Sequence, residues 1–274
     1  MQRELIRRPG ATQRRNLAIV CAGDQSDHRT WFRPGAARNY DLMVVYYGSK
    51  SSNYGADADI YLARQGPKYA LLHLVSRVYS KLLRSYDFIW CPDDDIAAEV
   101  GQVDQLFEIA RAWDLEIAQP AISAGEMSFE ALRQVPGSLL RFSPFVEVMC
   151  PLFRRDTFFR FSPMFPESRS GWGLDMVWSK HVPHGKIAII DAVGMRHTRP
   201  LFSGKSYEIL AERGVDPFDE LHRVSKKYGG IRRRQMRHLS DGRTRMETVP
   251  LGATSEAYGL RRLAWRFARL WPAF

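Results

Sequence analysis

The sequence predicts an α/β protein with a mainly parallel sheet and helices on both faces. Short apolar runs that end at turn residues recur through the first half of the chain, and amphipathic helical patterns separate them. The length of 274 residues suffices for one sizeable domain with appendages. In sheets of this kind ligands bind at the carboxyl ends of the strands. Residues that directly follow a strand are therefore the first candidates for a functional site.

The first half of the chain supplies most of the predicted sheet. The run 16–21 is apolar and ends at the turn Ala22-Gly23-Asp24, and the run 41–47 ends in the same way at Gly48. Pro67 suits the first position of a helix, and an apolar stripe follows it up to Leu82. The predicted strands are 16–21, 41–47, 86–91 and 115–119, and the predicted helices are 68–82 and 103–110.

In the second half of the chain, predicted strands and helices no longer alternate regularly. The runs 145–153 and 186–192 are predicted strands, and the segment 162–173 between them is loop-like. Residues 209–228 are predicted to be helical on either side of a break at 214–217. The polar, arginine-rich stretch 229–254 is predicted to have no regular structure.

Composition indicates a folded protein of a reducing compartment. Hydrophobic residues make up 45% and aromatic residues 12% of the chain. Three widely spaced cysteines match neither a disulfide framework nor a zinc site. No apolar run reaches the roughly 18 residues of a spanning helix, and the N-terminus lacks the apolar region of a secretory signal. We therefore expect a cytoplasmic location.

Positive charge is concentrated at the two ends. Residues 223–274 contain 13 Lys/Arg and 3 acidic residues, and residues 1–15 contain 5 Lys/Arg and 1 acidic residue. The remaining residues, 16–222, contain 22 basic and 26 acidic residues. Basic extensions on an acidic core are typical of contact with an anionic surface, whereas a nucleic-acid-binding domain carries its basic patch on the fold. We predict a basic arm (1–15), a folded domain (16–222), a basic linker (223–257) and an amphipathic helix (258–274).

The last of these segments has two interpretations. Its apolar residues recur at helical spacing and arginines surround them, which is the pattern of a helix lying on an anionic membrane. A helix docked on the folded core has the same pattern. The first interpretation predicts a peripheral protein on the inner face of the membrane. The apolar positions are Leu260, Leu263, Ala264, Phe267, Leu270 and Trp271, and the arginines are Arg261, Arg262, Arg266 and Arg269.

Three consecutive aspartates, Asp93, Asp94 and Asp95, follow the predicted strand 86–91. Adjacent carboxylates repel one another, and a divalent cation such as Mg²⁺ or Mn²⁺ prefers carboxylate and phosphate oxygens. In an extended turn Asp93 and Asp95 point the same way, and Asp94 faces the protein or a sugar hydroxyl. The alternative is a solvated acidic turn or a helix N-cap.

Two later motifs favour a functional interpretation of the aspartates. The first, SGWGLDMVW (170–178), sets Asp175 between glycines, which allow close backbone approach, and tryptophans, which offer stacking faces for sugars. Asp175 is then placed to take a proton from an acceptor hydroxyl, and a helix cap beside core tryptophans is the alternative. The second, DAVGMRHTRP (191–200), follows a predicted strand and supplies a histidine between two arginines. His197 is either a third metal ligand or structural, and Arg196 or Arg199 would meet phosphate.

The order of these motifs resembles the GT-A class of glycosyltransferases. More closely, the chain is similar to an uncharacterised domain family of plants and bacteria that is often labelled lysine-ketoglutarate reductase trans-splicing related, a label that does not describe its chemistry. The similarity spans about residues 16–222. It implies a GT-A-like, Rossmann-like catalytic domain, with an activity inferred by analogy. The similar segments are RNYDLMVVYYG (38–48), GPKY (66–69), YDFIWCPDDDI (86–96), FVEVMCPLF (145–153), SGWGLDMVW (170–178) and IIDAVGMRHTRP (189–200).

The resemblance implies roles for individual residues. Asp93 and Asp95 correspond to the DxD ligands of Mn²⁺ or Mg²⁺, and His197 to the late histidine that completes the metal site. Asp175 corresponds to the base of inverting members. Asp24 and Asp41, at or near the ends of the first two strands, correspond to positions that contact the nucleoside.

Further candidates rest on the residues themselves. Lys68 is a candidate for the diphosphate, with a surface lysine at a helix start as the alternative, and Arg199 is a second diphosphate candidate. Asp94 is assigned to the donor side. Glu147 lies in an apolar run, where a buried acid is costly without a partner, and it is a candidate for the acceptor site together with Trp172.

The resemblance implies a metal-dependent glycosyltransferase of polysaccharide biosynthesis. It would move a sugar from a nucleotide-sugar to a hydroxyl of a saccharide or lipid-linked glycan. Asp175 as base implies inversion, whereas a retaining enzyme would use the same metal site without that base. Two other classes stay open: a nucleotidyltransferase or other nucleotide-handling metal enzyme, and a non-catalytic carbohydrate- or nucleic-acid-binding protein. Nucleic acid is not the expected partner, because the aromatics of the basic tail cluster with aliphatic residues.

Overall fold

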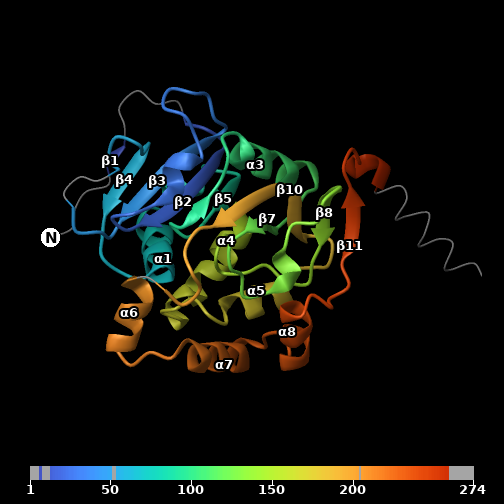
Figure 1. Ribbon diagram of the computed structural model, residues 1–274. Helices are drawn as coiled ribbons and strands as arrows, with labels where there is room; N and C mark the ends of the chain where they lie inside the picture. The colour runs from blue at the N-terminus through green and yellow to red at the C-terminus, as the bar shows by residue number, and fades with distance from the viewer. Residues whose placement is uncertain (1–5, 8–12, 51–53, 204, 259–274) are drawn as a thin grey trace, which may run out of the picture.

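The computed structural model of the protein describes residues 6–7, 13–50, 54–203 and 205–258 (Figure 1). Over these residues the strands form one large sheet with helices packed on both faces, which confirms the predicted α/β class. Most of the predicted basic arm at 1–15 and all but the first residue of the predicted C-terminal helix at 258–274 lie outside the described residues.

Figure 1 labels the larger elements with the names used here, and its colours follow the chain from blue to red. The strands are β1 (Ile6–Arg7), β2 (Asn16–Ala22), β3 (Tyr40–Tyr46), β4 (Ile60–Ala63), β5 (Phe88–Trp90), β6 (Ile96–Ala97), β7 (Ile117–Ala124), β8 (Ser138–Phe142), β9 (Leu152–Arg154), β10 (Ile187–His197) and β11 (Glu247–Pro250). The α-helices are α1 (Lys68–Val78), α2 (Ser80–Leu83), α3 (Gln102–Ala112), α4 (Arg155–Phe161), α5 (Leu174–His181), α6 (Lys205–Glu212), α7 (Pro217–Tyr228) and α8 (Arg233–Ser240). Short 3-10 helices are η1 (Asp27–Thr30), η2 (Glu130–Leu132) and η3 (Ser162–Glu167).

The sheet is mixed, with one dominant direction. Within the described chain its strand order is β1-β4-β3-β2-β5-β9-β7-β10-β8-β11, and β6 pairs with β10. Strands β4, β3, β2 and β5 are mutually parallel, and so are β7 and β10. Strand β9 runs antiparallel between these two groups. Following the pairings across the sheet, β2, β3, β4, β5, β7, β10 and β11 all point one way, so the sheet is mainly parallel in direction.

Two hydrophobic clusters pack against the two faces of the sheet. Alternate residues of β2 divide between them, as the pleat of a strand requires. Val20 belongs to the cluster that contains Leu106 of α3, and Ile19 to the cluster that contains Leu72 of α1. Helices α4 and α5 contribute to the α1 face through residues such as Phe158. This two-sided core holds the strands rigidly and leaves their carboxyl ends to the connecting loops.

The strongly periodic predictions are confirmed. Five predicted strands, 16–21, 41–47, 86–91, 115–119 and 186–192, correspond to β2, β3, β5, β7 and β10. The two predicted helices correspond to α1 and α3, and the predicted helical stretch 209–228 is α6 and α7 with a break between them. In each case an apolar run or stripe long enough to define one face of the element was present in the sequence.

Three predictions about the second half are wrong. The predicted strand 145–153 is irregular except at its end, where β9 begins at Leu152. Pro144 and Pro151 in and beside it have no N–H to donate to a sheet. The segment 162–173, predicted as a loop, begins with the 3-10 helix η3. The stretch 229–254, predicted to be unstructured, contains α8 and β11.

The predicted basic linker 223–257 therefore contributes to the fold. Strand β11 pairs antiparallel with β8 and extends the sheet past residue 222. Its Val249 is fully buried, and Leu239 of α8 is 1% exposed. These single apolar anchors stabilise the segment, although its arginine-rich composition conceals them in the sequence. No helix of the described residues combines the length and apolar character that a membrane crossing needs.

Candidate functional site

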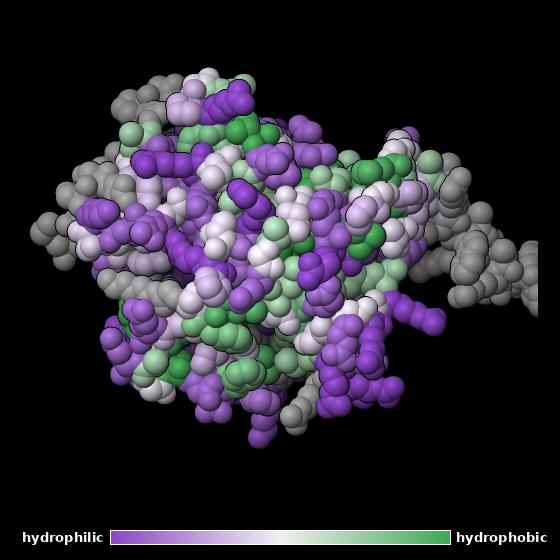
Figure 2. All heavy atoms as spheres, viewed as in Figure 1, coloured by the Kyte–Doolittle hydropathy of each residue, from purple (hydrophilic) through white to green (hydrophobic). Residues whose placement is uncertain are grey.

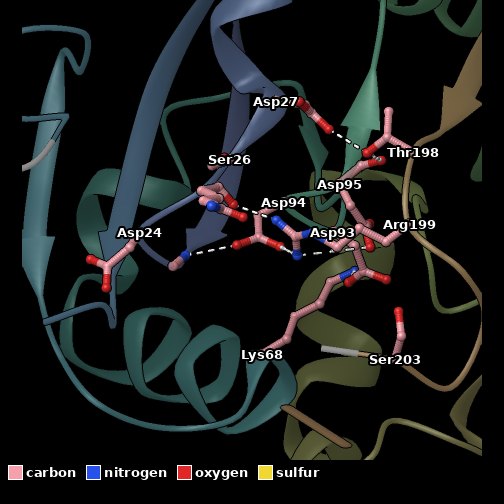
Figure 3. Close-up of polar contacts among 12 residues, drawn as sticks. Asp24, Ser26, Asp27, Lys68, Asp93, Asp94, Asp95, Thr198, Arg199 and Ser203 are labelled. Atoms are coloured by element: carbon pink, nitrogen blue, oxygen red, sulfur yellow. Dashed lines mark hydrogen bonds and ion pairs between the residues drawn. The ribbon is translucent and has the colours of Figure 1, made fainter. Parts of the chain in front are cut away.

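The three consecutive aspartates lie where β5 ends, at the carboxyl edge of the parallel strands. Pro92 has no N–H, and the residues on either side of it donate to the neighbouring segment: Cys91 to the carbonyl of Pro151 at 2.8 Å and Asp93 to that of Met149 at 2.7 Å. These bonds fix the direction in which the chain leaves the sheet. Figure 3 shows that the aspartates, Lys68 of α1 and Arg199 after β10 converge here.

Asp94 faces the protein. Its Oδ2 accepts a hydrogen bond from Gly23 N at 2.7 Å and one from the Tyr47 hydroxyl at 3.2 Å, and its Oδ1 accepts from Arg199 at 2.9 Å (Figure 3). Burial raises the pKa of Asp94 despite the opposing charge of Arg199. Asp94 thus ties the end of β2, the acidic turn and the chain after β10 together, and of its two predicted orientations it adopts the one toward the protein.

Asp93 is paired with Lys68, at the start of α1. The Lys68 ammonium donates to Asp93 Oδ1 at 2.7 Å and to the carbonyls of Val148 and Met149 at 2.8 and 2.9 Å, which uses all three of its donors. Burial raises the pKa of Asp93 to about 6, with Lys68 opposing the shift and Asp95 adding to it. Its side chain is 41% exposed, so this carboxylate is open to solvent.

Asp95 faces His197 at the end of β10. Asp95 Oδ2 lies 3.4 Å from His197 Nε2 and 3.9 Å from Arg199, and the buried Oδ1 has no hydrogen-bond partner among the described residues. His197 Nδ1 lies 2.8 Å from the carbonyl of Glu126, an acceptor, so Nδ1 carries the proton. Burial disfavours charge on both groups, but their pairing outweighs it: the pKa of Asp95 is lowered and that of His197 is raised to about 9.

These residues suit a divalent cation by their chemistry. A histidine whose Nδ1 is held by a carbonyl presents Nε2 in the way that metal-binding histidines do. Two carboxylates and an imidazole form a donor set that Mn²⁺ accepts, and the unpartnered Asp95 Oδ1 is a buried group without a ligand. In the part of the chain that the structure describes, however, no group of three or more His, Cys, Asp or Glu side chains has the arrangement of a metal site. Lys68 and His197 instead balance the charges of Asp93 and Asp95.

A second pair of buried acids, Glu147 and Asp175, lies near the aspartates. Asp175 is 4% exposed at the start of α5, where its Oδ1 accepts from Met176 N at 2.9 Å. Burial raises its pKa to about 7, against hydrogen bonds from the backbone. Glu147 is 5% exposed with Oε2 unpartnered among the described residues, and burial followed by the charge of Asp175 raises its pKa to about 8. Both carboxyls are therefore able to exchange a proton near neutral pH.

The glycines of the GWG motif permit close packing. Gly171 has φ +87°, and a Cβ there would lie 2.7 Å from the Tyr69 ring. Gly173 has φ +90°, and a Cβ there would lie 2.9 Å from Cα of Leu221. Residues with side chains rarely adopt this backbone conformation, so only glycine fits at both places. The loop is thereby pressed onto α1 and α7, and α5 begins directly after it with Leu174 and Asp175.

Trp172, between these glycines, lies in an aromatic cluster. Its ring is 5.0 Å from that of Phe218 and 5.7 Å from that of Phe202, and its Nε1 donates to the Tyr207 hydroxyl at 3.3 Å. Phe202 and Phe218 are 54% and 55% exposed. Burial raises the pKa of Tyr207, and the negative charges of Asp93 and other site acids add to the effect, which places this hydroxyl within their electrostatic reach.

The two predicted nucleoside contacts, Asp24 and Asp41, lie outside the acid cluster. Asp24 follows β2 but points away from the acid cluster (Figure 3) and accepts hydrogen bonds from Tyr46, Ser49 and Lys50. These bonds lower its pKa, with the Tyr46 hydroxyl first among them. Asp41 is the second residue of β3 and so lies at the opposite edge of the sheet from the site. Asp41 was predicted to lie at or near an end of its strand, and the end at which it lies is the amino end, away from the acid cluster.

Asp41 belongs to a structural network at that opposite edge. It is buried, accepts from the Tyr86 hydroxyl at 2.7 Å and pairs with Arg14 at 2.9 Å. A surface pocket lies beside this network, and each of its three arginines pairs with an aspartate. Its lining residues are Arg14, Arg15, Asn16, Asn39, Glu108 and Arg111.

Sequence reasoning missed the support behind His197. The carbonyl of Glu126 orients its ring, and Gly125, at φ +95°, runs so close that a Cβ would lie 1.9 Å from the His197 carbonyl oxygen. The glycine after the apolar run 117–122 was a visible turn signal, but its contact with a residue 72 positions later is not readable from spacing. Arg199, and not the exposed Arg196, reaches the aspartates.

Gly125→Ala is expected to destabilise the protein by clearly more than the roughly 1 kcal/mol that strained backbone at a glycine site costs. The added methyl must displace either the turn or the backbone of His197. Gly101→Ala is the matched control, since Gly101 has φ +91° but nothing within 4 Å of its Cβ position. Urea unfolding of both variants measures the difference. Equal losses of unfolding free energy would mean that the close approach to His197 has no energetic role.

No family model matches the chain, and neither does any curated protein. Among solved structures it is similar to GalNAc-T7 with UDP, GalNAc and Mn²⁺, with a TM-score of 0.47 and 11% identity over 82% of this chain and 56% of that one. It is also similar to S. aureus TarS 1–349 in complex with UDP-GlcNAc, with a TM-score of 0.43 and 9% identity over 84% and 71% of the two chains. A third similar structure is A197 from STIV, with a TM-score of 0.37 and 10% identity over 67% of this chain and 85% of that one.

The chain thus spans less than two thirds of the length of GalNAc-T7. With TM-scores below 0.5 and identities near 10%, these similarities do not establish a shared function.

Proposed function

We propose that this protein is a metal-dependent glycosyltransferase that moves a sugar from a nucleotide-sugar to a hydroxyl of a saccharide or lipid-linked glycan. The observation that carries the proposal is the convergence of Asp93, Asp95 and His197 with Lys68 and Arg199 at the carboxyl edge of the sheet. Acids for a cation and cations for a diphosphate are what a nucleotide-sugar donor requires.

The contacts support the following roles for the residues around the donor. Asp93, Asp95 and His197 would hold Mn²⁺ or Mg²⁺, which offsets negative charge on the diphosphate when bound. Lys68 pairs with Asp93 and Arg199 with Asp94, so both cations lie at the acid cluster, where they would attract the negative charge of a diphosphate. Asp94 serves as the anchor of this arrangement, and Asp24, near the end of β2, is proposed to contact the nucleoside through its loop.

The transfer step needs a base on the acceptor side. We assign this role to Asp175, which takes the proton of the acceptor hydroxyl while the oxygen of that hydroxyl bonds to the anomeric carbon. The bond from that carbon to the diphosphate oxygen breaks, and the nucleoside diphosphate leaves with the bonding electrons. A single displacement of this kind inverts the anomeric centre. Glu147, beside Asp175, and the ring of Trp172 are proposed to line the acceptor site.

The aromatic cluster supports a saccharide as the acceptor. Phe202 and Phe218 are half exposed on either side of Trp172, and aromatic faces are the usual platforms for sugar rings. The Trp172–Tyr207 hydrogen bond connects this platform to the segment that follows Arg199.

The proposal is tested with a panel of UDP-, GDP-, dTDP- and CMP-sugars in the presence and absence of Mn²⁺. We expect one donor class to bind, or to be hydrolysed slowly because water takes the place of the missing acceptor. EDTA is expected to abolish both effects. Exchange of pyrophosphate into a nucleotide without sugar release would instead identify a nucleotidyltransferase. No response to any donor with either Mn²⁺ or Mg²⁺ would overturn the proposal.

A further inference from the structure

Helix α8 has one packed face and one strongly basic face. Leu239 is 1% exposed, and Met236 packs partly buried against the core on the same side of the helix. Arg234 and Arg237 are exposed on the opposite side, and Arg232, which precedes the helix, is exposed as well. The helix is thus anchored to the protein by its apolar residues and presents its arginines to the outside.

The charge on this face is uncompensated. The segment 231–245 contains six arginines and one acid, Asp241, which is a net charge of +5 with His238 neutral. Among the described residues, none of Arg232, Arg234 and Arg237 has an ion-pair partner, whereas arginines elsewhere in the fold commonly pair with an acid. Figure 2 shows the hydrophilic side chains that gather at the lower right, where Figure 1 places α8.

Clustered cations of this kind repel one another and lower the stability of the folded state unless an anionic surface compensates them. The segment 231–252 contains no Phe, Tyr or Trp, so it offers no stacking platform for nucleic-acid bases. Leu251 is 57% exposed directly after β11, which lies at the same end of the molecule as α8 (Figure 1). The sequence after it, 258–274, continues with apolar residues and arginines.

We propose that the arginine face of α8 is a docking surface for an anionic lipid bilayer. Each basic residue held near such a surface contributes about 1 kcal/mol of binding free energy, and the contribution is screened by salt. Exposed apolar groups beside the arginines add to binding at an interface. The surface lies at the end of the sheet opposite β1, so docking leaves the acid cluster at the carboxyl edge of β5 free for its donor.

The test is co-sedimentation of the full chain with vesicles of phosphatidylglycerol and phosphatidylcholine, compared with phosphatidylcholine alone. The variant replaces Arg232, Arg234 and Arg237 by glutamine, and its affinity for the anionic vesicles is expected to fall about 100-fold, since 1.4 kcal/mol corresponds to tenfold. The matched control replaces three exposed arginines outside the patch, Arg33, Arg64 and Arg77, by glutamine and removes the same charge. It is expected to bind as the unchanged chain does, and urea unfolding verifies that both variants are folded.

Equal losses in both variants would attribute binding to net charge and overturn the proposal, as would unchanged binding in the α8 variant. A third arm uses a single-stranded RNA oligonucleotide. If the chain binds the RNA through the same three arginines and does not bind the anionic vesicles, the surface is a nucleic-acid site and the bilayer is wrong.

Discussion

Asp95→Asn is expected to lower the affinity of the protein for Mn²⁺ in the presence of a nucleoside diphosphate by about 100-fold or more, since losing even an outer-shell partner of a metal ligand costs 10–100-fold. Asparagine keeps the shape of the side chain but removes the charge that faces His197 and Arg199. It also leaves a neutral amide where the buried Oδ1 has no partner among the described residues. Both changes weaken the donor set for a hard cation.

Calorimetric titration with Mn²⁺ measures this effect directly, and donor turnover measures its consequence. Asp156→Asn is the control, because Asp156 is 68% exposed and, among the described residues, pairs with its neighbour Arg155. Asp94→Asn offers a second comparison: its amide keeps one acceptor oxygen, so either Gly23 N or Arg199 loses its acceptor, and the fold around the site is expected to be destabilised. Wild-type Mn²⁺ affinity in Asp95→Asn would exclude Asp95 as a ligand and remove the basis of the metal claim.

The residues predicted from the sequence differ in outcome for a physical reason. Asp93, Asp94 and Asp95 are brought to the site because a short apolar strand and a proline determine where they leave the sheet. Asp41 does not reach the acid cluster because it stands at the beginning of its strand. In a parallel sheet, ligands bind at the other end of the strands, the carboxyl end. The apolar pattern thus locates a strand in the sequence. Whether a polar residue of that strand reaches the site depends on which end of the strand it occupies.

What the sequence did not reveal depends on contacts between distant segments. The Lys68–Asp93 pair joins residues 25 positions apart, and the hydrogen bond that orients His197 joins residues 71 apart. The irregular segment before β9 was predicted as a strand because its residues are apolar. Its backbone is satisfied instead by side chains of other elements, among them Lys68, Tyr69 and Trp178. Strand β11 was missed because one buried valine among polar neighbours is too weak a signal.

Asp175→Asn is expected to lower the turnover number by a factor of about 10²–10⁴, the usual contribution of a positioned base. Asparagine keeps an acceptor oxygen for Met176 N, so a residue with a purely structural role in α5 would tolerate the change. Loss of activity with an intact fold therefore separates a base from a structural residue. Glu147→Gln, made at the neighbouring buried acid, is the comparison that decides which of the two carboxyls takes the proton.

The pH dependence sharpens this test. A base must be ionised, so wild-type kcat/KM is expected to rise with pH and to level off above the pKa of Asp175, which burial raises to about 7. The rise should disappear in Asp175→Asn and persist in Glu147→Gln; the reverse result would transfer the role to Glu147.

Stability should change with pH in the opposite direction to activity. A folded-state pKa above the unfolded value means that the folded state binds the proton more tightly, so the stabilisation is complete below about pH 4 and is lost as the pH rises through about 7. Urea unfolding from pH 5 to pH 8 should therefore show a steeper loss for the wild type than for Asp175→Asn. Parallel curves would mean that Asp175 keeps its ordinary pKa. With its raised pKa, Asp175 is expected to give full activity over the same pH range in which its ionised, buried carboxylate destabilises the fold most. This compromise is expected of an acid that is buried for catalysis.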